Sequence, residues 1–188
     1  RPENIADFSG RIYKEANRLG NLVADIIQLS RLDEQQDAVV SMESVELDEL
    51  AKDVVNNLRD HAEKKNISLD YCGIPINIQG VRHVLYEMLY NIADNAVRYT
   101  NPGGHIHIYV GRKGDRPFYR VEDDGIGIPK SEQKRIFERF YRVDKSHSRQ
   151  TGGTGLGLSI VKHGATLHHA QINVHSDLGK GTKMELLF

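Results

Sequence analysis

Residues 81–100 read VRHVLYEMLYNIADNAVRYT, and the spacing of their apolar side chains predicts a helix. The apolar stripe of this helix consists of Val84, Met88, Ile92 and Ala96. The same helix carries Asn91 and Asn95 one turn apart, although asparagine forms helices poorly because its amide competes for local backbone groups. The pair is therefore either a solvated surface feature or part of a binding site.

The segments on either side of this helix alternate between strand and helix patterns. A short strand is expected at 42–47 (MESVEL) and a strand at 67–71 (ISLDY). Between them a helix is expected at 48–65, with Leu50, Val54 and Leu58 as its apolar stripe. Four further strands are expected at 105–111, 118–124, 171–176 and 182–188. This order predicts an α+β fold, a two-layer sandwich with helices on one face of a mixed sheet.

The first 34 residues carry a repeat of seven that predicts a long amphipathic helix. Its two apolar positions are occupied by Ile5, Ile12, Leu19 and Ile26 and by Phe8, Leu22 and Leu29, with Glu15 as a polar exception. Such a helix either packs on its own domain or forms a bundle, and we favour a bundle with a second copy of the chain.

Composition excludes several classes of protein. The chain has 188 residues, enough for one core with an appendage, and its net charge of -1 gives no reason to expect a nucleic-acid partner. The nine histidines do not follow a metal-ligand spacing, and the single cysteine, Cys72, excludes an internal disulfide. No apolar run approaches the ~18 residues of a membrane span. Because the chain begins inside a helical pattern, we expect it to be a fragment of a longer protein.

Residues 121–129, VEDDGIGIP, place a carboxylate and two glycines directly after a strand. Gly125 and Gly127 permit a close approach of the backbone to a ligand, and Asp123 suits an amine donor such as that of adenine. An ordinary Asp-Gly turn is the alternative reading of this stretch.

A second glycine cluster, TGGTGLGLSIV at 151–161, runs directly into an apolar helix. The first N–H groups of such a helix attract phosphate, yet the stretch has neither the P-loop nor the Rossmann spacing. The polar residues 144–153 before it suggest a lid, and residues 135–144 (RIFERFYRVD) offer Phe137 and Phe140 as packing anchors. Arg142 lies at the start of this lid, where its cation could meet a terminal phosphate.

Four motifs occur in the order found in sensor histidine kinases of two-component signalling, and the chain resembles that family over essentially its whole length. They are an N-box (NIADNAVRY), a G1 box (DDGIGIP), an F-box (RIFERFYRVD) and a G2 box (GGTGLGLSIVKH). The resemblance implies the Bergerat ATP-binding fold at 42–188, preceded at 1–36 by the second helix of the dimerisation domain.

The same resemblance implies roles for residues that match these motifs. Asn95 would hold Mg²⁺ with Asn91 beside it, and Arg98, where the family usually has lysine, and Tyr99 would line the phosphate and nucleotide side. Asp123 would accept a hydrogen bond from the adenine amine of ATP. The remaining contacts to nucleotide and phosphates would come from Gly125, Gly127, Arg142, Thr154, Gly155, Leu156 and Gly157.

Two departures from the family pattern stand out. None of the nine histidines has the family's H-box setting, so the phosphoacceptor is expected on a helix that precedes this chain. His169 and Ala170 replace a Gly-Gly turn, which predicts a slightly different turn there.

The resemblance also implies partners and a location. The partners are a response regulator and a second copy joined through the N-terminal helix, and the chain is the cytoplasmic portion of a membrane-anchored bacterial sensor.

Three other readings compete with the kinase. Water-activating ATPases of this fold place a glutamate where this chain has Asn91. A degenerate module for nucleotide binding or dimerisation would be expected to lose the asparagine, the aspartate or the glycines, and all are present. A metal or nucleic-acid domain lacks ligand spacing and a basic patch in the sequence. The kinase is therefore the favoured function, with in-line phosphoryl transfer from ATP to a histidine as its reaction.

Overall fold

The computed structural model describes residues 8–10, 12–13, 15–16, 19–20, 23, 26–27, 41–143 and 154–188. Its strands are β1 (Glu43–Glu46), β2 (Ser68–Gly73), β3 (Asn77–Gly80), β4 (His105–Lys113), β5 (Arg116–Asp123), β6 (Gln171–Asp177) and β7 (Gly181–Leu187). The helices within 41–143 and 154–188 are α2 (Leu47–Lys64), α3 (Arg82–Tyr99), α5 (Gly157–Leu167) and the 3₁₀ turn η1 (Arg135–Phe137).

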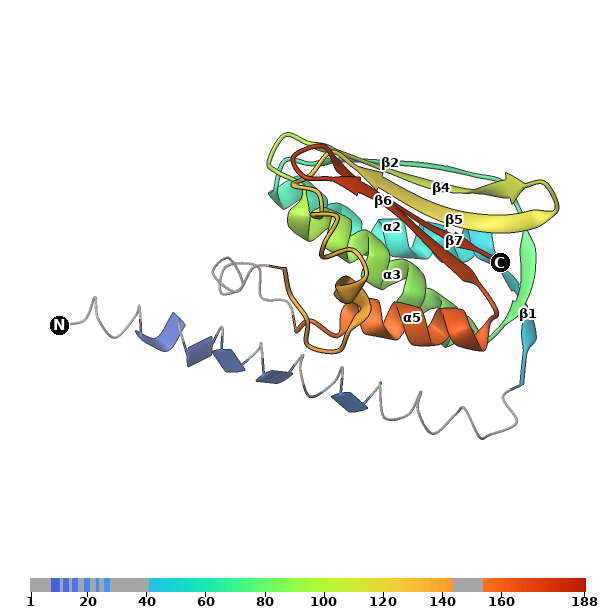
Figure 1. Ribbon diagram of the computed structural model, residues 1–188, viewed down its shortest axis with the longest axis horizontal. Helices are drawn as coiled ribbons and strands as arrows, with labels where there is room; N and C mark the ends of the chain where they lie inside the picture. The colour runs from blue at the N-terminus through green and yellow to red at the C-terminus, as the bar shows by residue number, and fades with distance from the viewer. Residues whose placement is uncertain are drawn as a thin grey trace.

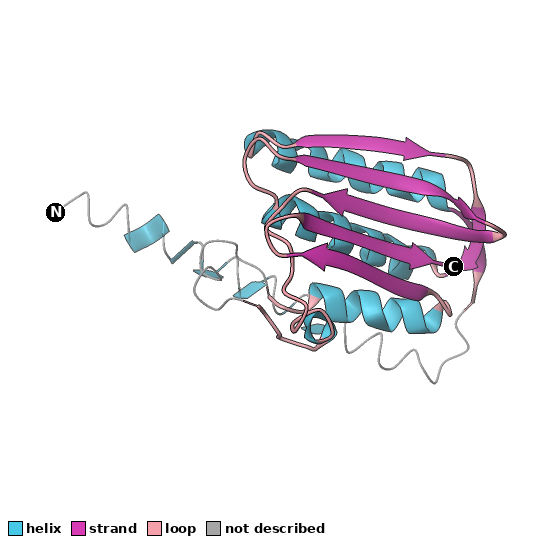
Figure 2. Ribbon diagram, turned by 45° about the horizontal axis from the view of Figure 1, so that its top comes forward, coloured by secondary structure: helices cyan, strands magenta, loops and turns pink. Residues whose placement is uncertain are grey.

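Five strands form the main sheet in the order β2-β4-β5-β7-β6. β2 and β4 run parallel, whereas the other neighbours are antiparallel, so the sheet is mixed. Helices α2, α3 and α5 lie side by side on one face of this sheet, and its other face carries no helix from this part of the chain (Figures 1 and 2). The expected α+β two-layer sandwich is confirmed.

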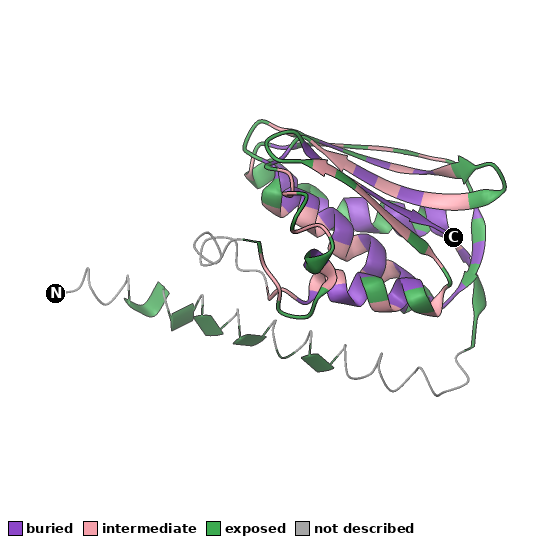
Figure 3. Cartoon of the chain, in the orientation of Figure 1, coloured by how far each residue is buried: buried purple, intermediate pink, exposed green. Residues whose placement is uncertain are grey.

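The core fills the space between the sheet and the three helices (Figure 3). The predicted stripe of α3 is buried in full, and so is that of α2, which consists of Leu50, Val54 and Leu58. α3 and α5 approach closely at Gly164, where an added Cβ would lie 2.5 Å from Met88 Sδ. This glycine sets the position of α5 beside the asparagine-bearing helix.

One short strand was not expected from the sequence. β3 pairs antiparallel with β1 in a two-stranded sheet, with Val45 opposite Ile78. Both side chains are buried, and Leu47 N–H, at the start of α2, donates to the Ile76 carbonyl oxygen at 2.8 Å. The small sheet therefore closes the end of the core at the start of α2.

Only single residues and short pieces of the predicted N-terminal helix are described, and these are helical. Large apolar side chains on them are exposed, namely Phe8, Ile12, Tyr13, Leu19, Val23, Ile26 and Ile27. The other heptad residues, Ile5, Leu22 and Leu29, lie outside the described residues. A search of the described helices finds none with the length and apolar character needed to cross a bilayer.

Candidate nucleotide-binding site

The two asparagines lie on one face of α3, as their spacing predicts. Asn91 Nδ2 donates to the Glu87 carbonyl oxygen at 2.8 Å, one turn earlier on the helix. A Cβ built on Gly157, the first residue of α5, would lie 2.5 Å from Asn91 Oδ1. The Asn91 amide is therefore held between its own helix and the start of α5.

The last turn of α3 carries Arg98 and Tyr99. Arg98 Nε pairs with Asp94 Oδ2 at 2.5 Å, and the Tyr99 side chain is exposed. Lys65 Nζ donates to the carbonyl oxygens of Val97, Arg98 and Thr100 at 2.7, 2.9 and 3.1 Å. A cation at a helix C-terminus satisfies carbonyls that have no partner within the helix, so Lys65 fixes the end that presents Arg98.

Asp123 ends β5, and backbone groups from two segments hold its carboxylate. Gly125 N–H and Thr182 N–H both donate to Asp123 Oδ1, at 2.9 and 3.2 Å. Within the described part of the chain, Asp123 Oδ2 has no protein donor, and it is not among the buried polar atoms without a partner. This oxygen is therefore open to an external donor.

Burial raises the pKa of the Asp123 carboxyl to about 6, against the lowering effect of the hydrogen bonds from Gly125 and Thr182. The neighbouring Asp124 adds a smaller repulsion in the same direction as burial. A carboxylate with its charge desolvated in this way gains from any ligand that donates a hydrogen bond to it.

We call residues 123–127 the G1 turn; it is anchored to two other parts of the fold through backbone groups. Ile126 N–H donates to the Tyr99 carbonyl oxygen at 3.2 Å, and Gly179 N–H donates to the Ile126 carbonyl oxygen at 2.7 Å. Gly127 has a φ of +68°, and a Cβ there would lie 2.0 Å from the Asp177 carbonyl oxygen. The turn thus joins the end of α3 to the β6–β7 connection.

We call residues 154–157 the G2 loop; it contacts the segment that follows η1. Phe140 N–H donates to the Gly155 carbonyl oxygen at 2.9 Å, and Leu156 N–H donates to Thr154 Oγ1 at 3.3 Å. Leu156 is fully buried and precedes α5. Phe137 packs against the core as predicted, whereas the prediction for Phe140 was wrong: its ring is 58% exposed, and the residue has a φ of +62°.

The remaining predicted features lie at the edge of what is described. Arg142 is half-buried near the end of the stretch 41–143, and its expected contact with a phosphate stays a prediction. The proposed lid, residues 144–153, lies outside the described residues.

Contacts connect several of the predicted residues across the fold. α3 meets the G2 loop through Asn91 and Gly157, and it meets the G1 turn through Tyr99 and Gly125. Sequence reasoning missed Thr182 and Lys65, which act on the site through a backbone N–H and an ammonium group. In the sequence, Thr182 is marked only by the neighbouring glycines at 179 and 181, and Lys65 only by the basic pair at 64–65.

Comparison with known proteins identifies the fold and the motifs as those of one family. Residues 80–188 match the family described as "Histidine kinase-, DNA gyrase B-, and HSP90-like ATPase". The chain is 34% identical over 186 residues to the sensor-like histidine kinase SenX3 of Mycolicibacterium smegmatis, covering 98% of this chain and 48% of that protein. It is 37% identical over 186 residues to SenX3 of Mycobacterium tuberculosis, covering 98% of this chain and 45% of that protein. The chain thus spans about half the length of these curated relatives.

Solved structures agree with this assignment. The mycobacterial sensor histidine kinase MprB superposes with a TM-score of 0.68 at 25% identity, over 78% of this chain and 96% of that chain. Full-length ShkA, solved in complex with AMPPNP, superposes with a TM-score of 0.75 at 27% identity, over 90% of this chain and 35% of that chain.

The family match covers more than half of the chain, and it confirms the predicted resemblance. The chain belongs to the histidine kinase-, DNA gyrase B- and HSP90-like ATPase family, and the relatives reported above are named as sensor histidine kinases.

Proposed function

We propose that this chain transfers the γ-phosphoryl group of ATP to a histidine outside residues 1–188, as part of a sensor histidine kinase. In this proposal residues 42–188 are the catalytic ATP-binding domain, and residues 1–36 are the second helix of the dimerisation domain. The observation that supports it best is the Asp123 carboxylate, which has one oxygen fixed by two backbone donors and one oxygen open.

Asp123 recognises the adenine amine through Oδ2. Gly125 N–H and Thr182 N–H keep Oδ1 in place, so the open oxygen is already oriented when the nucleotide arrives. Gly125 and Gly127 keep the wall of the pocket free of side chains, which lets backbone approach the flat base. An amine donor also relieves the cost of the desolvated charge.

The asparagine pair fits a magnesium site. Amide oxygens are neutral, hard ligands of the kind that Mg²⁺ accepts, and the Asn95 amide has no hydrogen-bond partner among the described residues. Asn95 would therefore hold the ion, with Asn91 beside it at the start of α5. When bound there, Mg²⁺ would neutralise charge on the phosphate oxygens.

Cations and backbone N–H groups act on the phosphates. The Asp94 carboxylate orients the Arg98 guanidinium through a hydrogen bond from Nε at 2.5 Å. Arg142 meets the γ-phosphate, and Thr154, Gly155, Leu156 and Gly157 close over the phosphate chain in front of the positive end of α5. These groups position the γ-phosphoryl group for in-line attack by an imidazole nitrogen and offset its charge.

The proposal extends to partners. An aspartate of a response regulator takes the phosphoryl group from the histidine. The exposed apolar residues of the N-terminal segment, such as Phe8, Ile12 and Leu19, pair with a second copy, and the chain is the cytoplasmic portion of a membrane-anchored bacterial sensor.

The alternative is a module that binds nucleotide or dimerises without catalysis. Calorimetric titration with Mg-ADP, for the parent and for Asp123→Ala, tests the shared requirement. Saturable binding by the parent and none by the variant supports the pocket, whereas no binding by either leaves only the dimerisation module. A longer chain that includes the preceding helix then tests phosphotransfer directly. In it, Arg142→Ala should slow transfer and keep ADP affinity, and an equal loss of ADP affinity would contradict the role of Arg142.

A further inference from the structure

The face of the main sheet that carries no helix has a groove of about 590 Å³. Figure 2 shows this face toward the viewer with the helices behind it. The groove is lined by Arg112, Lys113, Phe118, Arg120, Gln171, Asn173, His175, Lys183, Glu185 and Leu187. None of the residues assigned above to ATP lines it, so the groove is a separate feature of the molecule.

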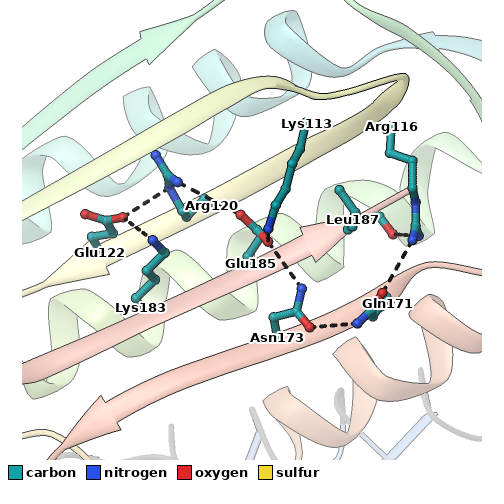
Figure 4. Close-up of polar contacts among 9 residues, drawn as sticks. All are labelled: Lys113, Arg116, Arg120, Glu122, Gln171, Asn173, Lys183, Glu185 and Leu187. Carbon is teal, nitrogen blue, oxygen red and sulfur yellow. Dashed lines mark hydrogen bonds and ion pairs between the residues drawn. The ribbon is translucent and has the colours of Figure 1, made fainter.

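A chain of hydrogen bonds fixes the floor of this groove (Figure 4). Arg116 Nη1 donates to Gln171 Oε1 at 3.4 Å, and Gln171 Nε2 donates to Asn173 Oδ1 at 2.9 Å. Asn173 Nδ2 then donates to Glu185 Oε1 at 3.2 Å. Glu185 is only 5% exposed, so this carboxylate is part of the floor and is not available to a partner.

The cations of the groove are arranged around this buried carboxylate. Lys113 Nζ lies 3.7 Å from Glu185 Oε1, while the lysine side chain is 66% exposed. The Arg120 guanidinium lies 4.7 Å from the centroid of the Tyr109 ring and 5.1 Å from that of Phe118. Contacts with two rings restrict the arginine side chain, which is only 25% exposed, so Arg120 is a fixed part of the groove.

The charge of the groove favours a negative partner. Its lining contains four cationic residues and one carboxylate, although the chain as a whole has a net charge of -1. Glu122 lies at the edge, where it pairs with Arg120 at 3.1 Å and with Lys183 at 3.3 Å. The cations still exceed the carboxylates four to two when Glu122 is included, and the Lys183 side chain remains 41% exposed in its pair with Glu122.

We propose that this groove binds an acidic segment of a partner protein. Carboxylates of such a segment would meet Lys113, Lys183 and Arg112, while Glu185 and the stacked Arg120 keep the site in one conformation. A second copy of this face would bring like charges together, which disfavours a symmetric dimer through the groove. Nucleic acid is disfavoured because Arg120 covers the rings on which bases would stack.

The experiment uses a fluorescein-labelled oligoglutamate peptide of about eight residues as the probe, with anisotropy measured at low and at physiological ionic strength. The groove variant is Lys113→Gln with Lys183→Gln. The matched control is Arg59→Gln with Lys64→Gln, which removes the same charge from exposed positions of α2 on the helical face. Thermal unfolding shows whether each variant is folded. The peptide is titrated without nucleotide, so the result does not depend on whether the chain binds ATP.

We expect saturable binding to the parent and to the control, and a loss of at least about fivefold in affinity for the groove variant. Absence of saturable binding to the parent, or equal losses in the two variants, would overturn the proposal. A single-stranded oligonucleotide that binds the parent more tightly than a peptide of equal charge would also overturn it, because the groove would then be a general polyanion site. Self-association that only the groove variant abolishes would assign the groove to a second copy.

Discussion

The G1 turn and the G2 loop are both rich in glycine, but different neighbours surround their glycines. At Gly127 an added Cβ would meet the Asp177 carbonyl oxygen at 2.0 Å, and at Gly125 it would meet the Tyr99 carbonyl oxygen at 2.5 Å. These neighbours are backbone atoms of β6 and of α3. Both elements are packed in the core, so neither can move aside to make room for a side chain in the G1 turn. The G1 turn is therefore a rigid wall of the core.

The G2 loop has a softer environment. At Gly157 the nearest neighbour is the Asn91 side-chain amide, 2.5 Å from an added Cβ, and a side chain can rotate away. At Gly155 the neighbour is the Phe140 backbone at 2.9 Å, in a segment whose phenylalanine ring is exposed. The glycines of the G1 turn therefore maintain the fold, whereas Gly157 sets the position of a proposed ligand group.

The largest effect is expected for Gly127→Ala. The substitution combines a left-handed φ of +68° with a backbone clash, and we expect the free energy of unfolding to fall by about 3 kcal/mol or more. Urea unfolding measures this change. Gly179→Ala is the matched control, because its φ is +77° but an added Cβ meets nothing within 4 Å. Equal losses for the two variants would show that the clash is relieved and that the G1 turn is not rigid.

Asp123→Asn should give the next largest effect, and with opposite signs for stability and binding. Burial raises the pKa of Asp123 in the folded chain to about 6, above its ordinary value of 3.8, so the folded state binds this proton more tightly than the unfolded state. The contribution of Asp123 to stability therefore falls as pH rises from about 4 to about 6, by about 3 kcal/mol, and is constant above that window.

The neutral amide lacks this penalty, so nucleotide-free Asp123→Asn should be more stable than the parent at pH 7 while it binds ATP at least about tenfold more weakly. Urea unfolding at several pH values, and calorimetry with Mg-ADP, measure the two quantities. A stability difference between parent and variant that does not change between pH 4 and pH 7 would contradict the burial of charge at the G1 turn.

Much of the fold could be predicted from the sequence because periodicity reports burial directly. The stripes of α2 and α3 are buried as expected, and the five strands of the main sheet lie where alternation placed them. β3 could not be found in this way, because Asn77–Gly80 contains a single apolar residue and is a strand only through its pairing with β1. Pairing between distant segments leaves no local pattern.

The candidate site, too, could be predicted only in part. Asp123 and the glycines could be recognised because they belong to motifs that occur in a fixed order, but the roles of Lys65 and Thr182 depend on tertiary contacts. Lys65 lies in a basic pair that reads as solvated surface, yet its ammonium group binds three carbonyls at the end of α3. Thr182 contributes a backbone N–H, which no side-chain pattern can report.

Gly157→Ala should affect binding and leave stability nearly unchanged. Alanine is favourable at the start of a helix, so the free energy of unfolding should stay within about 1 kcal/mol of the parent. The added methyl group displaces the Asn91 amide, and we expect Mg-ATP affinity to fall about tenfold, which corresponds to about 1.4 kcal/mol. Calorimetry in the presence and absence of Mg²⁺ measures it. A variant that loses stability and keeps its affinity for Mg-ATP would show that Gly157, like Gly127, maintains the fold and does not position Asn91.

The smallest effect is expected at the end of α5. It measures the free-energy cost of a left-handed φ at a residue other than glycine, a cost that the glycines of both segments avoid. His169 has a φ of +52°; its N–H donates to the Thr166 carbonyl oxygen, and Ala170 N–H donates to that of Ala165, the pattern in which helices usually carry glycine. His169→Gly should therefore raise the free energy of unfolding by up to about 1 kcal/mol, reduced by the greater freedom of glycine in the unfolded chain. Asn66, two residues after the end of α2, has a φ of +56° and the same pattern of hydrogen bonds. Asn66→Gly is therefore the matched control and should gain less, because asparagine tolerates this conformation. Thermal and urea unfolding measure both changes. If His169→Gly gains no more than Asn66→Gly, the left-handed conformation costs histidine little here, and the loss expected for Gly179→Ala must be revised downward with it.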